Sequence, residues 1–333
     1  MTDKLILAVP SKGRLEENAA SLFDKAGIGL KRDGARGYTG SVKGIDAIDV
    51  QYVSASEIAA RLADGSVHFG ITGEDLLREE IIDMDSVVQL VMPLGFGHAD
   101  VVVAIPDSWV DVTTMFDLAE VAADFRSQHG KRLRVATKYG QLAGDFFARH
   151  NMSDYKLVSS FGATEAAPNS GAAEAIVDIT STGATLVANQ LRIPEDGLIL
   201  KSQANLAASL KAAWSGAVRS AAKKLLARLG AYKRAQELVQ INISSDPGMA
   251  GARLTQDDLA TLFDNYQAVE DQHFQGATST GGSFFGFQVP SRQQDAFIDA
   301  ALAMGFERAS VAKLDFVYEK RNPLYERLVG ALD

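Results

Sequence analysis

The stretch from Glu174 to Leu191, EAIVDITSTGATLVANQL, contains the residue types that bind a sugar phosphate. Its apolar first half is typical of a buried strand that carries Asp178, and a loop of small hydroxyl residues and glycine follows before a predicted helix. Amide N–H groups at the start of a helix favour an anion, and glycine lets the backbone approach that anion closely. The candidate phosphate ligands are Ser181, Thr182, Gly183, Ala184 and Thr185. Asp178 could accept hydrogen bonds from sugar hydroxyl groups.

The same pattern has an alternative interpretation without a ligand. A strand that turns directly into a helix needs a capping residue, and Thr185 or Ser181 is suited to be the N-cap. The loop alone is compatible with both interpretations.

A cationic motif, Ser11-Lys12-Gly13-Arg14, directly follows a predicted strand at Leu5–Val9. Two cations around a glycine suit a polyphosphate, because a guanidinium can donate two parallel hydrogen bonds to it. The alternative is a surface turn with solvated cations. A further motif, Phe69–Leu77 (FGITGEDLL), places Gly73 at a strand end and Glu74-Asp75 at the start of a helix. Acidic residues there also complement the helix dipole, so this motif is weak evidence by itself.

A second carboxylate, Glu165 in GATEAAP, lies thirteen residues before Asp178. Neither residue has a cysteine or histidine cluster near it, so a dedicated zinc site is not expected. Mg²⁺ shared with substrate phosphates would leave little trace in the sequence. The histidines have no metal or triad spacing and are interpreted as structural: His68, His98, His129, His150 and His273.

The composition limits the classes of protein that these motifs could serve. The chain has 333 residues, 47% hydrophobic and 23% charged, which is ordinary for a soluble globular protein of two or three domains. It has no cysteine, which excludes disulfides, zinc-thiolate sites and a thiol nucleophile. A net charge of −9 argues against nonspecific binding to nucleic acid or anionic membranes. No apolar run is long enough for a signal peptide or a membrane span, so we expect a cytoplasmic protein.

Up to about Leu200 the chain alternates β-rich runs with helical stretches. The predicted strands are Leu5–Val9, Ala47–Val53, Val67–Thr72, Ala99–Ile105, Leu133–Thr137, Lys156–Ser160, Ala175–Thr180 and Leu198–Leu200. The predicted helices are Leu15–Ala26, Glu57–Ala63, Thr113–Ala123, Gly140–His150 and Ala184–Asn189. This rhythm predicts an α/β fold with parallel sheet, which binds ligands at the carboxyl ends of its strands. A domain boundary is predicted after Ile105, at Pro106-Asp107-Ser108.

The remaining chain has a different pattern. Apolar residues at helical spacing from Leu206 to Gln236, with many cations and no acid, indicate an amphipathic connector with a solvated basic face. The alternative is a face that docks an acidic neighbouring subunit. After Gln236 the order is βαββαβ, which is a ferredoxin-like pattern. Its strands are predicted at Glu237–Ile243, Ala268–Phe274, Ser283–Val289 and Ala309–Tyr318, and its helices at Thr255–Phe263 and Ser291–Met304.

Together the motifs resemble the ATP phosphoribosyltransferase family of histidine biosynthesis. AVPSKGRL, DGSVHFGITGEDLL, RLRVATKY, and GATEAAP followed by EAIVDITSTGATLVANQL are similar to four family motifs in the family's order. The C-terminal βαββαβ unit resembles the regulatory domain of the family's long form. The resemblance therefore covers nearly the whole chain.

The resemblance implies a two-lobed catalytic core like that of periplasmic binding proteins, with the active site in the cleft. Lobe I would contain residues 1–105 and 198–236, lobe II residues 106–197, and the regulatory domain residues 237–333. Asp178 and Glu165 would hold the ribose hydroxyls of phosphoribosyl pyrophosphate, and the loop Ser181–Thr185 would hold its 5′-phosphate. Lys12, Gly13 and Arg14 would bind the pyrophosphate or the ATP phosphates. Gly73, Glu74 and Tyr139 would border the nucleotide.

The implied reaction joins N1 of ATP to C1 of the ribose, with Mg²⁺ and with release of pyrophosphate. The resemblance also implies histidine as an allosteric inhibitor and a homo-oligomer (dimer or hexamer). The hydroxyl and backbone donors of the loop GATSTGGS (Gly276–Ser283) suggest that histidine binds near it at a subunit interface, and the alternative is an unstructured loop tip. The alternatives are a catalytically weak regulatory paralogue and a two-lobed small-molecule binding protein. Three positions depart from the family pattern and concern its pyrophosphate and ATP contacts. Tyr52 stands in place of an arginine, His68 in place of an acid, and Gly97-His98-Ala99-Asp100 lacks a Cys-Arg pair.

Overall fold

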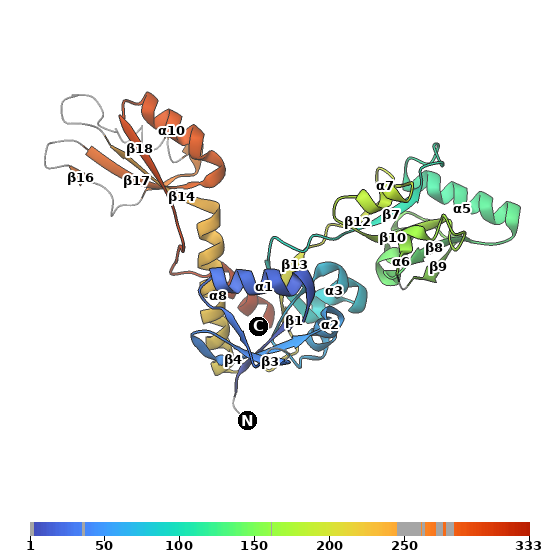
Figure 1. The fold of residues 1–333 in the computed structure, drawn as a ribbon, viewed down its shortest axis with the longest axis horizontal. Helices are drawn as coiled ribbons and strands as arrows, with labels where there is room; N and C mark the ends of the chain where they lie inside the picture. The colour runs from blue at the N-terminus through green and yellow to red at the C-terminus, as the bar shows by residue number, and fades with distance from the viewer. Residues whose placement is uncertain are drawn as a thin grey trace. The chain divides into compact units, whose positions relative to one another are not determined.

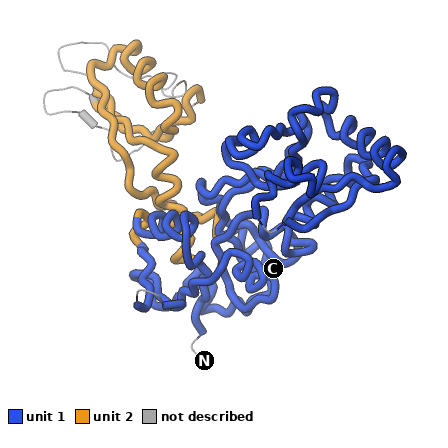
Figure 2. Tube along the Cα trace, turned by 45° about the vertical axis from the view of Figure 1, so that its right-hand side comes forward, with its two compact units in different colours: residues 1–24, 28–222, 326–333 blue, residues 25–27, 223–325 orange. Residues whose placement is uncertain are grey.

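The computed structural model describes residues 3–34, 37–160, 162–244, 261, 264–270, 276–277 and 283–333. The chain divides into two compact units, which are coloured separately in Figure 2. Unit 1 contains Met1–Asp24, Ile28–Ala222 and Glu326–Asp333, and unit 2 contains Lys25–Gly27 and Lys223–Tyr325.

The first sheet of unit 1 has seven strands in the order β2-β3-β4-β1-β5-β13-β6. Figure 1 labels β1, β3, β4 and β13 of this sheet. The strands are β1 (Leu5–Pro10), β2 (Leu30–Arg32), β3 (Thr39–Val42), β4 (Ile45–Val53), β5 (Phe69–Gly73), β6 (Val88–Pro93) and β13 (Ala204–Ser209). The helices that follow them in sequence are α1 (Gly13–Lys25), α2 (Ala55–Asp64), α3 (Glu74–Glu80) and α4 (Met84–Val87). Strand β1 is central and parallel to β4 and β5, and its apolar side chains are almost all buried. This burial explains its uninterrupted apolar sequence.

The second sheet of unit 1 has the order β11-β7-β10-β8-β9, with β12 also paired to β7. The strands are β7 (Asp100–Pro106), β8 (Leu133–Thr137), β9 (Tyr155–Ser159), β10 (Ala175–Thr180), β11 (Leu191–Arg192) and β12 (Leu198–Leu200). Its helices are α5 (Met115–His129), α6 (Gly140–Arg149), the 3₁₀ helix η1 (Thr164–Ala166) and α7 (Ala184–Ala188). Alternate residues of β10 enter two different cores, because Val177 packs into one and Ile176 into the other.

Both sheets are mixed, which corrects the prediction of parallel sheet. Strand β13 runs antiparallel to β5 and β6, and β7 runs antiparallel to β10. Alternating strands and helices imply parallel pairing only for strands that are connected through a helix. Strands β1 and β5 are parallel neighbours of this kind. The chain passes between the sheets twice, and each passage adds an antiparallel strand.

The predicted lobe boundaries at 105 and 198 are also wrong. Strands β7 and β12 both belong to the second sheet, where they pair with each other. The passages between the sheets lie at residues 94–99 and 201–203, between the strands of one sheet and those of the other. The two passages are hydrogen bonded to each other, since Ala99 N–H donates to the Ser202 carbonyl at 3.0 Å. Pro106, which the sequence suggests as the boundary, is the last residue of β7.

Helix α8 (Gly216–Glu237) begins ten residues later than the predicted connector. Leu206 belongs to strand β13, whose small apolar residues happen to continue the helical spacing. Within the helix, Leu225 and Leu229 are buried while Lys223, Lys224 and Arg228 are exposed. The amphipathic character with a solvated basic face is therefore confirmed for these cations.

Unit 2 contains one antiparallel sheet in the order β15-β17-β14-β18, with β16 paired to β17. The strands are β14 (Leu238–Ser244), β15 (Val269–Glu270), β16 (Gly276–Ala277), β17 (Ser283–Pro290) and β18 (Arg308–Lys313). The helical elements are η3 (Ser291–Gln293) and α10 (Gln294–Ala303), and α11 (Pro323–Leu332) begins in unit 2 and continues in unit 1 from Glu326. Phe287 and Phe297 pack together in its core, with ring centroids 5.2 Å apart.

Some predictions about this region need correction, and others lie outside the described residues. The last strand ends at Lys313 and not at Tyr318, and α11 was not predicted. The division of the chain falls inside α8, between residues 222 and 223, and not at residue 237. Most of the predicted helix Thr255–Phe263, and the loop residues Thr278–Gly282, lie outside the described residues.

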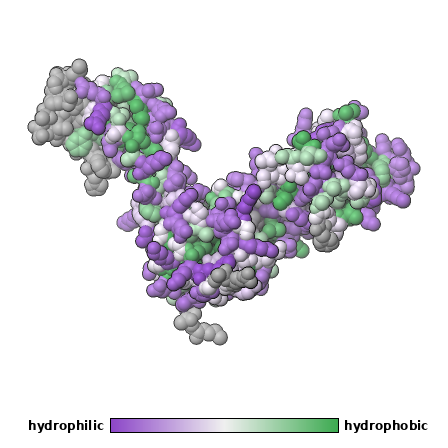
Figure 3. Space-filling model, in the orientation of Figure 1, coloured by the Kyte–Doolittle hydropathy of each residue, from purple (hydrophilic) through white to green (hydrophobic). Residues whose placement is uncertain are grey.

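The surface gives no sign of a membrane-spanning segment in the described part of the chain. No helix there combines the length and the apolar character needed to cross a bilayer. Hydrophilic residues cover most of the face drawn in Figure 3, and apolar residues form scattered patches.

Candidate functional site

The loop between β10 and α7 leaves the start of the helix without a side-chain cap. The N-cap residue is Gly183, which has φ 75°, a left-handed conformation that glycine adopts without strain. Thr180 Oγ1 accepts the Gly183 N–H at 2.8 Å and Thr182 Oγ1 accepts the Ala184 N–H at 3.4 Å. Neither Ser181 nor Thr185 is the N-cap, so that alternative prediction is wrong. Ser181, Thr182, Ala184 and Thr185 are exposed, and the loop can present hydroxyl and amide groups to a ligand.

Ser181 holds this loop at a fixed place in unit 1. Its hydroxyl donates to the His98 carbonyl at 2.9 Å, in the segment that leads into β7. Strands β7 and β10 are paired up to the same end, with Thr180 opposite Asp100. The loop therefore begins at a position that the sheet determines.

Asp178 lies near the end of β10, opposite Val102 of β7. It is half-buried, and its Oδ1 accepts the Ile179 N–H at 2.8 Å, so the other oxygen is available for a ligand. Glu165 lies in η1, which packs against β10. Its carboxylate is half-buried and makes no hydrogen bond or ion pair within the described part of the chain. The structure thus places both predicted carboxylates on the second sheet and its adjoining 3₁₀ helix.

The turn Ser11–Arg14 lies at the carboxyl end of β1. The Ser11 N–H donates to the Val53 carbonyl at 2.9 Å, which continues the pairing of β1 with β4 by one residue. Gly13 has φ 80° and begins α1. Lys12 and Arg14 are exposed and have no hydrogen bond or ion pair with any described residue. Two cations are therefore free to bind an anion at this end of the first sheet.

Tyr139 connects elements of the two sheets. It is the N-cap residue of α6, it is 2% exposed, and its hydroxyl donates to Asp75 Oδ2 at 3.0 Å. Asp75 lies in the first turn of α3, and its Oδ1 accepts the Ser202 hydroxyl at 2.8 Å. Burial raises the pKa of Tyr139 strongly, and the nearby carboxylates of Asp75, Asp178 and Glu79 raise it further. The tyrosine therefore stays protonated and keeps this hydrogen bond.

Gly73 and Glu74 surround this connection. A Cβ atom at Gly73 would lie 2.3 Å from Asp75 Oδ1, so only glycine leaves room for the carboxylate. The Glu74 carboxylate forms an ion pair with Arg78, with 2.7 Å between Glu74 Oε1 and Arg78 Nε. Gly73 therefore lies beside the Asp75 carboxylate that accepts the Tyr139 hydroxyl, whereas Glu74 is paired with Arg78.

Glu79 makes a second connection between the same helices. Its two carboxylate oxygens accept the N–H groups of Gln141 and Leu142, each at 3.0 Å. These are first-turn amides of α6, which a carboxylate satisfies and stabilises through the helix dipole. The predicted site residues thus form two groups, one on each sheet, and the α3–α6 contacts join the elements that carry them.

His68 has a structural role, as expected. It is buried, its Nδ1 accepts the Ile6 N–H at 3.0 Å, and its Nε2 lies 3.2 Å from the Ala213 carbonyl. These partners require the neutral ring with the proton on Nε2. Burial lowers the pKa of His68, which favours the same neutral form.

Comparison with known proteins decides the family. The model of the ATP phosphoribosyltransferase family matches residues 54–231. The ATP phosphoribosyltransferase of Rhodopseudomonas palustris (strain HaA2) is 48% identical over 333 residues, which cover 100% of this chain and 99% of that protein. The chain belongs to the ATP phosphoribosyltransferase family.

Other relatives agree with this assignment. The ATP phosphoribosyltransferase of Nitrobacter winogradskyi is 48% identical over 329 residues, 98% of each chain. A chain of the ATP phosphoribosyl transferase (HisG:HisZ) complex from Thermotoga maritima has a similar fold, with a TM-score of 0.52 and 23% identity over 68% of this chain and 96% of that chain. The family predicted from the four motifs is confirmed, and with it the enzyme class, a pentosyltransferase.

One departure from the ATP phosphoribosyltransferase pattern has a specific structural setting. Tyr52 is 4% exposed, and the guanidinium of Arg32 lies over its ring, with Cζ 3.8 Å from the ring centroid. Burial raises the pKa of Tyr52, while the charge of Arg32 opposes that shift. A cation is therefore present beside position 52, although the residue itself is neutral.

Sequence reasoning missed the residues that connect the two sheets. Glu79 and Gln141 are 62 positions apart in the sequence, and Asp75 and Ser202 are 127 apart. No short-range sequence pattern therefore predicts either contact. Glu74 and Asp75 at the start of α3 are visible in the sequence, but the dipole of their own helix is enough to explain acidic residues there. In this chain, these contacts become apparent only from the fold.

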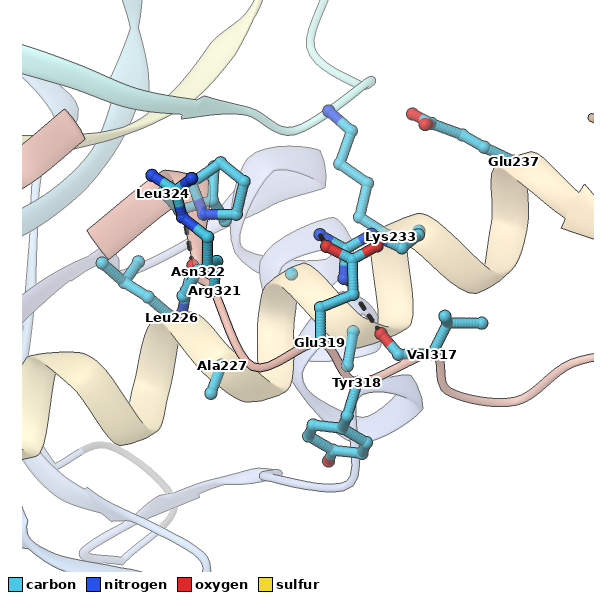
Figure 4. Close-up of a pocket in the computed structure, with 14 residues that line it drawn as sticks. Leu226, Ala227, Lys233, Glu237, Val317, Tyr318, Glu319, Arg321, Asn322 and Leu324 are labelled. Carbon is cyan, nitrogen blue, oxygen red and sulfur yellow. Dashed lines mark hydrogen bonds and ion pairs between the residues drawn. The ribbon is translucent and has the colours of Figure 1, made fainter. Parts of the chain in front are cut away.

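A separate cavity of about 180 Å³ lies in unit 2, between α8 and the segment that leads into α11 (Figure 4). Arg234 lines it and is held by Glu319, with 3.1 Å between NH2 and Oε2, and by the Val317 carbonyl at 3.1 Å. None of the predicted site residues lines this cavity. It is therefore distinct from the candidate site in unit 1.

Proposed function

We propose that this chain transfers the phosphoribosyl group of 5-phosphoribosyl 1-pyrophosphate to N1 of ATP, the first step of histidine biosynthesis. The observation that carries the proposal is the end of β10, where Asp178 lies two residues before the strand ends and an exposed loop leads to α7 with Gly183 as its N-cap. A carboxylate for a sugar and amides for its phosphate are thus adjacent in one strand-loop-helix unit. Full-length similarity to curated ATP phosphoribosyltransferases supports the same reaction.

In this proposal the Ser181–Thr185 loop binds the 5′-phosphate. Asp178 and Glu165 orient the ribose through its hydroxyl groups. N1 of ATP forms a bond to C1 of the ribose while the C1–O bond to pyrophosphate breaks, and the bonding pair leaves with pyrophosphate. The positive charge that develops on the ribose is stabilised by the two carboxylates, so neither needs to act as a general base.

The cations at the end of β1 bind the leaving group in this proposal. Lys12 and Arg14 are free of protein partners, and the left-handed Gly13 allows the backbone to approach the phosphates. Gly73 and Glu74 border the nucleotide. Tyr139, the N-cap residue of α6, positions the start of that helix by its hydrogen bond to Asp75. The contacts between α3 and α6 then hold the site residues of the first sheet in a fixed position relative to those of the second sheet.

Mg²⁺ is proposed to bind through the substrate phosphates. Among the described residues there is no group of three or more His, Cys, Asp or Glu side chains that could hold a metal ion. Mg²⁺ often takes only one or two carboxylates from a protein, and substrate phosphates supply further oxygen ligands. When bound, it neutralises the charge on the leaving pyrophosphate.

The C-terminal part of the chain is proposed to be a ferredoxin-like regulatory domain that binds histidine as an inhibitor in a homo-oligomer. The antiparallel sheet order β15-β17-β14-β18 supports this proposal, because β14 lies between β17 and β18, as the first strand of a βαββαβ chain lies between the third and the fourth. Deletion of residues 276–282 should abolish histidine binding measured by calorimetry. Unchanged histidine affinity would exclude this loop as the site.

The reaction is tested with the purified chain alone. ATP, phosphoribosyl pyrophosphate and Mg²⁺ are mixed with it, and formation of phosphoribosyl-ATP is followed by absorbance. We expect product without any added protein. Product only after addition of a partner subunit would support a regulatory paralogue, and binding without product would support a small-molecule binding protein.

A further inference from the structure

The side chain of Arg32 reaches from an outer strand to the end of the central strand β1. Arg32 is the last residue of β2, and the sheet order β2-β3-β4-β1 places two strands between them. Its NH2 group nevertheless donates to the Ser11 carbonyl at 3.2 Å. Ser11 directly precedes Lys12, so this guanidinium lies beside the cationic turn.

Gly40 and Tyr52 explain how the side chain crosses the sheet. Gly40 of β3 is paired with Arg32 and is buried. A Cβ atom at Gly40 would lie 3.1 Å from Tyr52 Cε2 and 2.4 Å from the Lys31 carbonyl, so the missing side chain makes room for the tyrosine ring. The guanidinium of Arg32 lies over that ring, which attracts a cation.

Glu16 fixes the guanidinium from the other side. Its Oε1 is 3.0 Å from Arg32 NH2, and it belongs to the first turn of α1, directly after the cationic turn. The side chains of Arg32 and Glu16 remain 23% and 29% exposed. Both hydrogen bonds of Arg32 use NH2, and a guanidinium has more N–H donors than these bonds consume. A preorganised, partly exposed cation therefore faces the place where an anion is proposed to bind.

We infer that Arg32 is a third polyphosphate ligand at the end of β1, together with Lys12 and Arg14, and that Tyr52 positions it. The inference rests on the proposed function of this end of the sheet. Planar guanidinium groups bind phosphates through two parallel hydrogen bonds, whereas an ammonium acts as a point charge. The polyphosphate is the pyrophosphate group or the triphosphate of ATP, which share this chemistry.

The test compares Arg32→Gln with Lys31→Gln, which removes the same charge from the neighbouring exposed residue. Inorganic pyrophosphate is titrated as a product inhibitor, and KM for each substrate and kcat are measured. Arg32→Gln should weaken pyrophosphate inhibition by about tenfold or more, because a hydrogen bond to a charged group is lost. Lys31→Gln should change the inhibition by pyrophosphate by less than about twofold, as expected for the loss of a surface charge. A loss confined to KM for ATP would support the site with the triphosphate as its ligand.

Glu16→Gln separates ligand binding from a structural role. This variant breaks the same ion pair but keeps the guanidinium, so a structural clamp predicts that both variants lose pyrophosphate affinity to the same degree. The inference predicts equal or tighter binding for Glu16→Gln. Unchanged pyrophosphate inhibition and unchanged KM values in Arg32→Gln would overturn it. If the wild-type chain makes no product, the proposed function fails, and calorimetry with pyrophosphate on the same variants still decides the role of Arg32.

Discussion

The Tyr139 hydroxyl donates to Asp75 Oδ2 at 3.0 Å and joins the start of α6 to the first turn of α3. Asp75 also accepts from Ser202, which lies in one of the two passages between the sheets. A single buried carboxylate therefore contacts the first sheet's helix, the second sheet's helix and the connecting chain. This arrangement fixes how the residues after β5 meet those after β8.

Removal of the Tyr139 hydroxyl should destabilise the protein. In Tyr139→Phe the buried Asp75 carboxylate loses a donor, and we expect the free energy of unfolding to fall by about 1–3 kcal/mol. Urea denaturation measures the change. Tyr155→Phe is the matched control, because Tyr155 packs its ring against Phe147 without a hydrogen bond from its hydroxyl to any described residue. Equal effects of the two variants would show that the Asp75 contact contributes nothing.

A methyl group at Gly73 should disrupt the same connection by steric contact. The added Cβ in Gly73→Ala would lie 2.3 Å from Asp75 Oδ1, so the carboxylate must move from its partners. We expect a loss of about 1–3 kcal/mol in unfolding free energy. Gly144→Ala places a methyl group on α6 with no atom within 4 Å and should be neutral or stabilising by up to about 1 kcal/mol. A Gly73→Ala variant as stable as Gly144→Ala would contradict the close approach.

His68 should make stability depend on pH. Its pKa is lowered by burial, so below its ordinary value of about 6.5 the unfolded chain binds a proton that the folded chain does not. The free energy of unfolding should therefore fall as the pH decreases from neutral toward 5. His68→Gln should reduce this dependence in denaturation curves recorded at several pH values. The exposed His129→Gln serves as the control, and a pH dependence unchanged by His68→Gln would exclude the buried ring as its source.

Strands with strong local patterns were predictable from the sequence. The β-branched run before Asp178 and the apolar run before Ser11 both form the expected strands. The predicted helical stretch that begins at Leu206 includes most of strand β13, because Leu206 continues the apolar spacing of the following helix. The antiparallel direction of β13 depends on the passage at 201–203, where the sequence has no local pattern that predicts the change of sheet.

The candidate site was predictable only where its residues are close in sequence. The loop Ser181–Thr185 and the turn at Lys12 were recognised from adjacent residues of suitable chemistry. Arg32 was not, because its approach to Ser11 depends on a glycine in β3 and a tyrosine in β4. Contacts of this kind follow from strand register, which a sequence pattern does not specify.

The kinetics of Asp178→Ala test the central claim, that the end of β10 binds the reacting ribose. The substitution removes contacts to the reacting ring, so kcat should fall by at least about tenfold. Asp111→Ala, in an exposed turn of unit 1, should retain wild-type kinetics. Phosphoribosyl-ATP formation at saturating ATP and Mg²⁺ provides the measurement. A large decrease confined to Asp178→Ala is the result that we predict, and near-wild-type turnover in that variant would contradict the account.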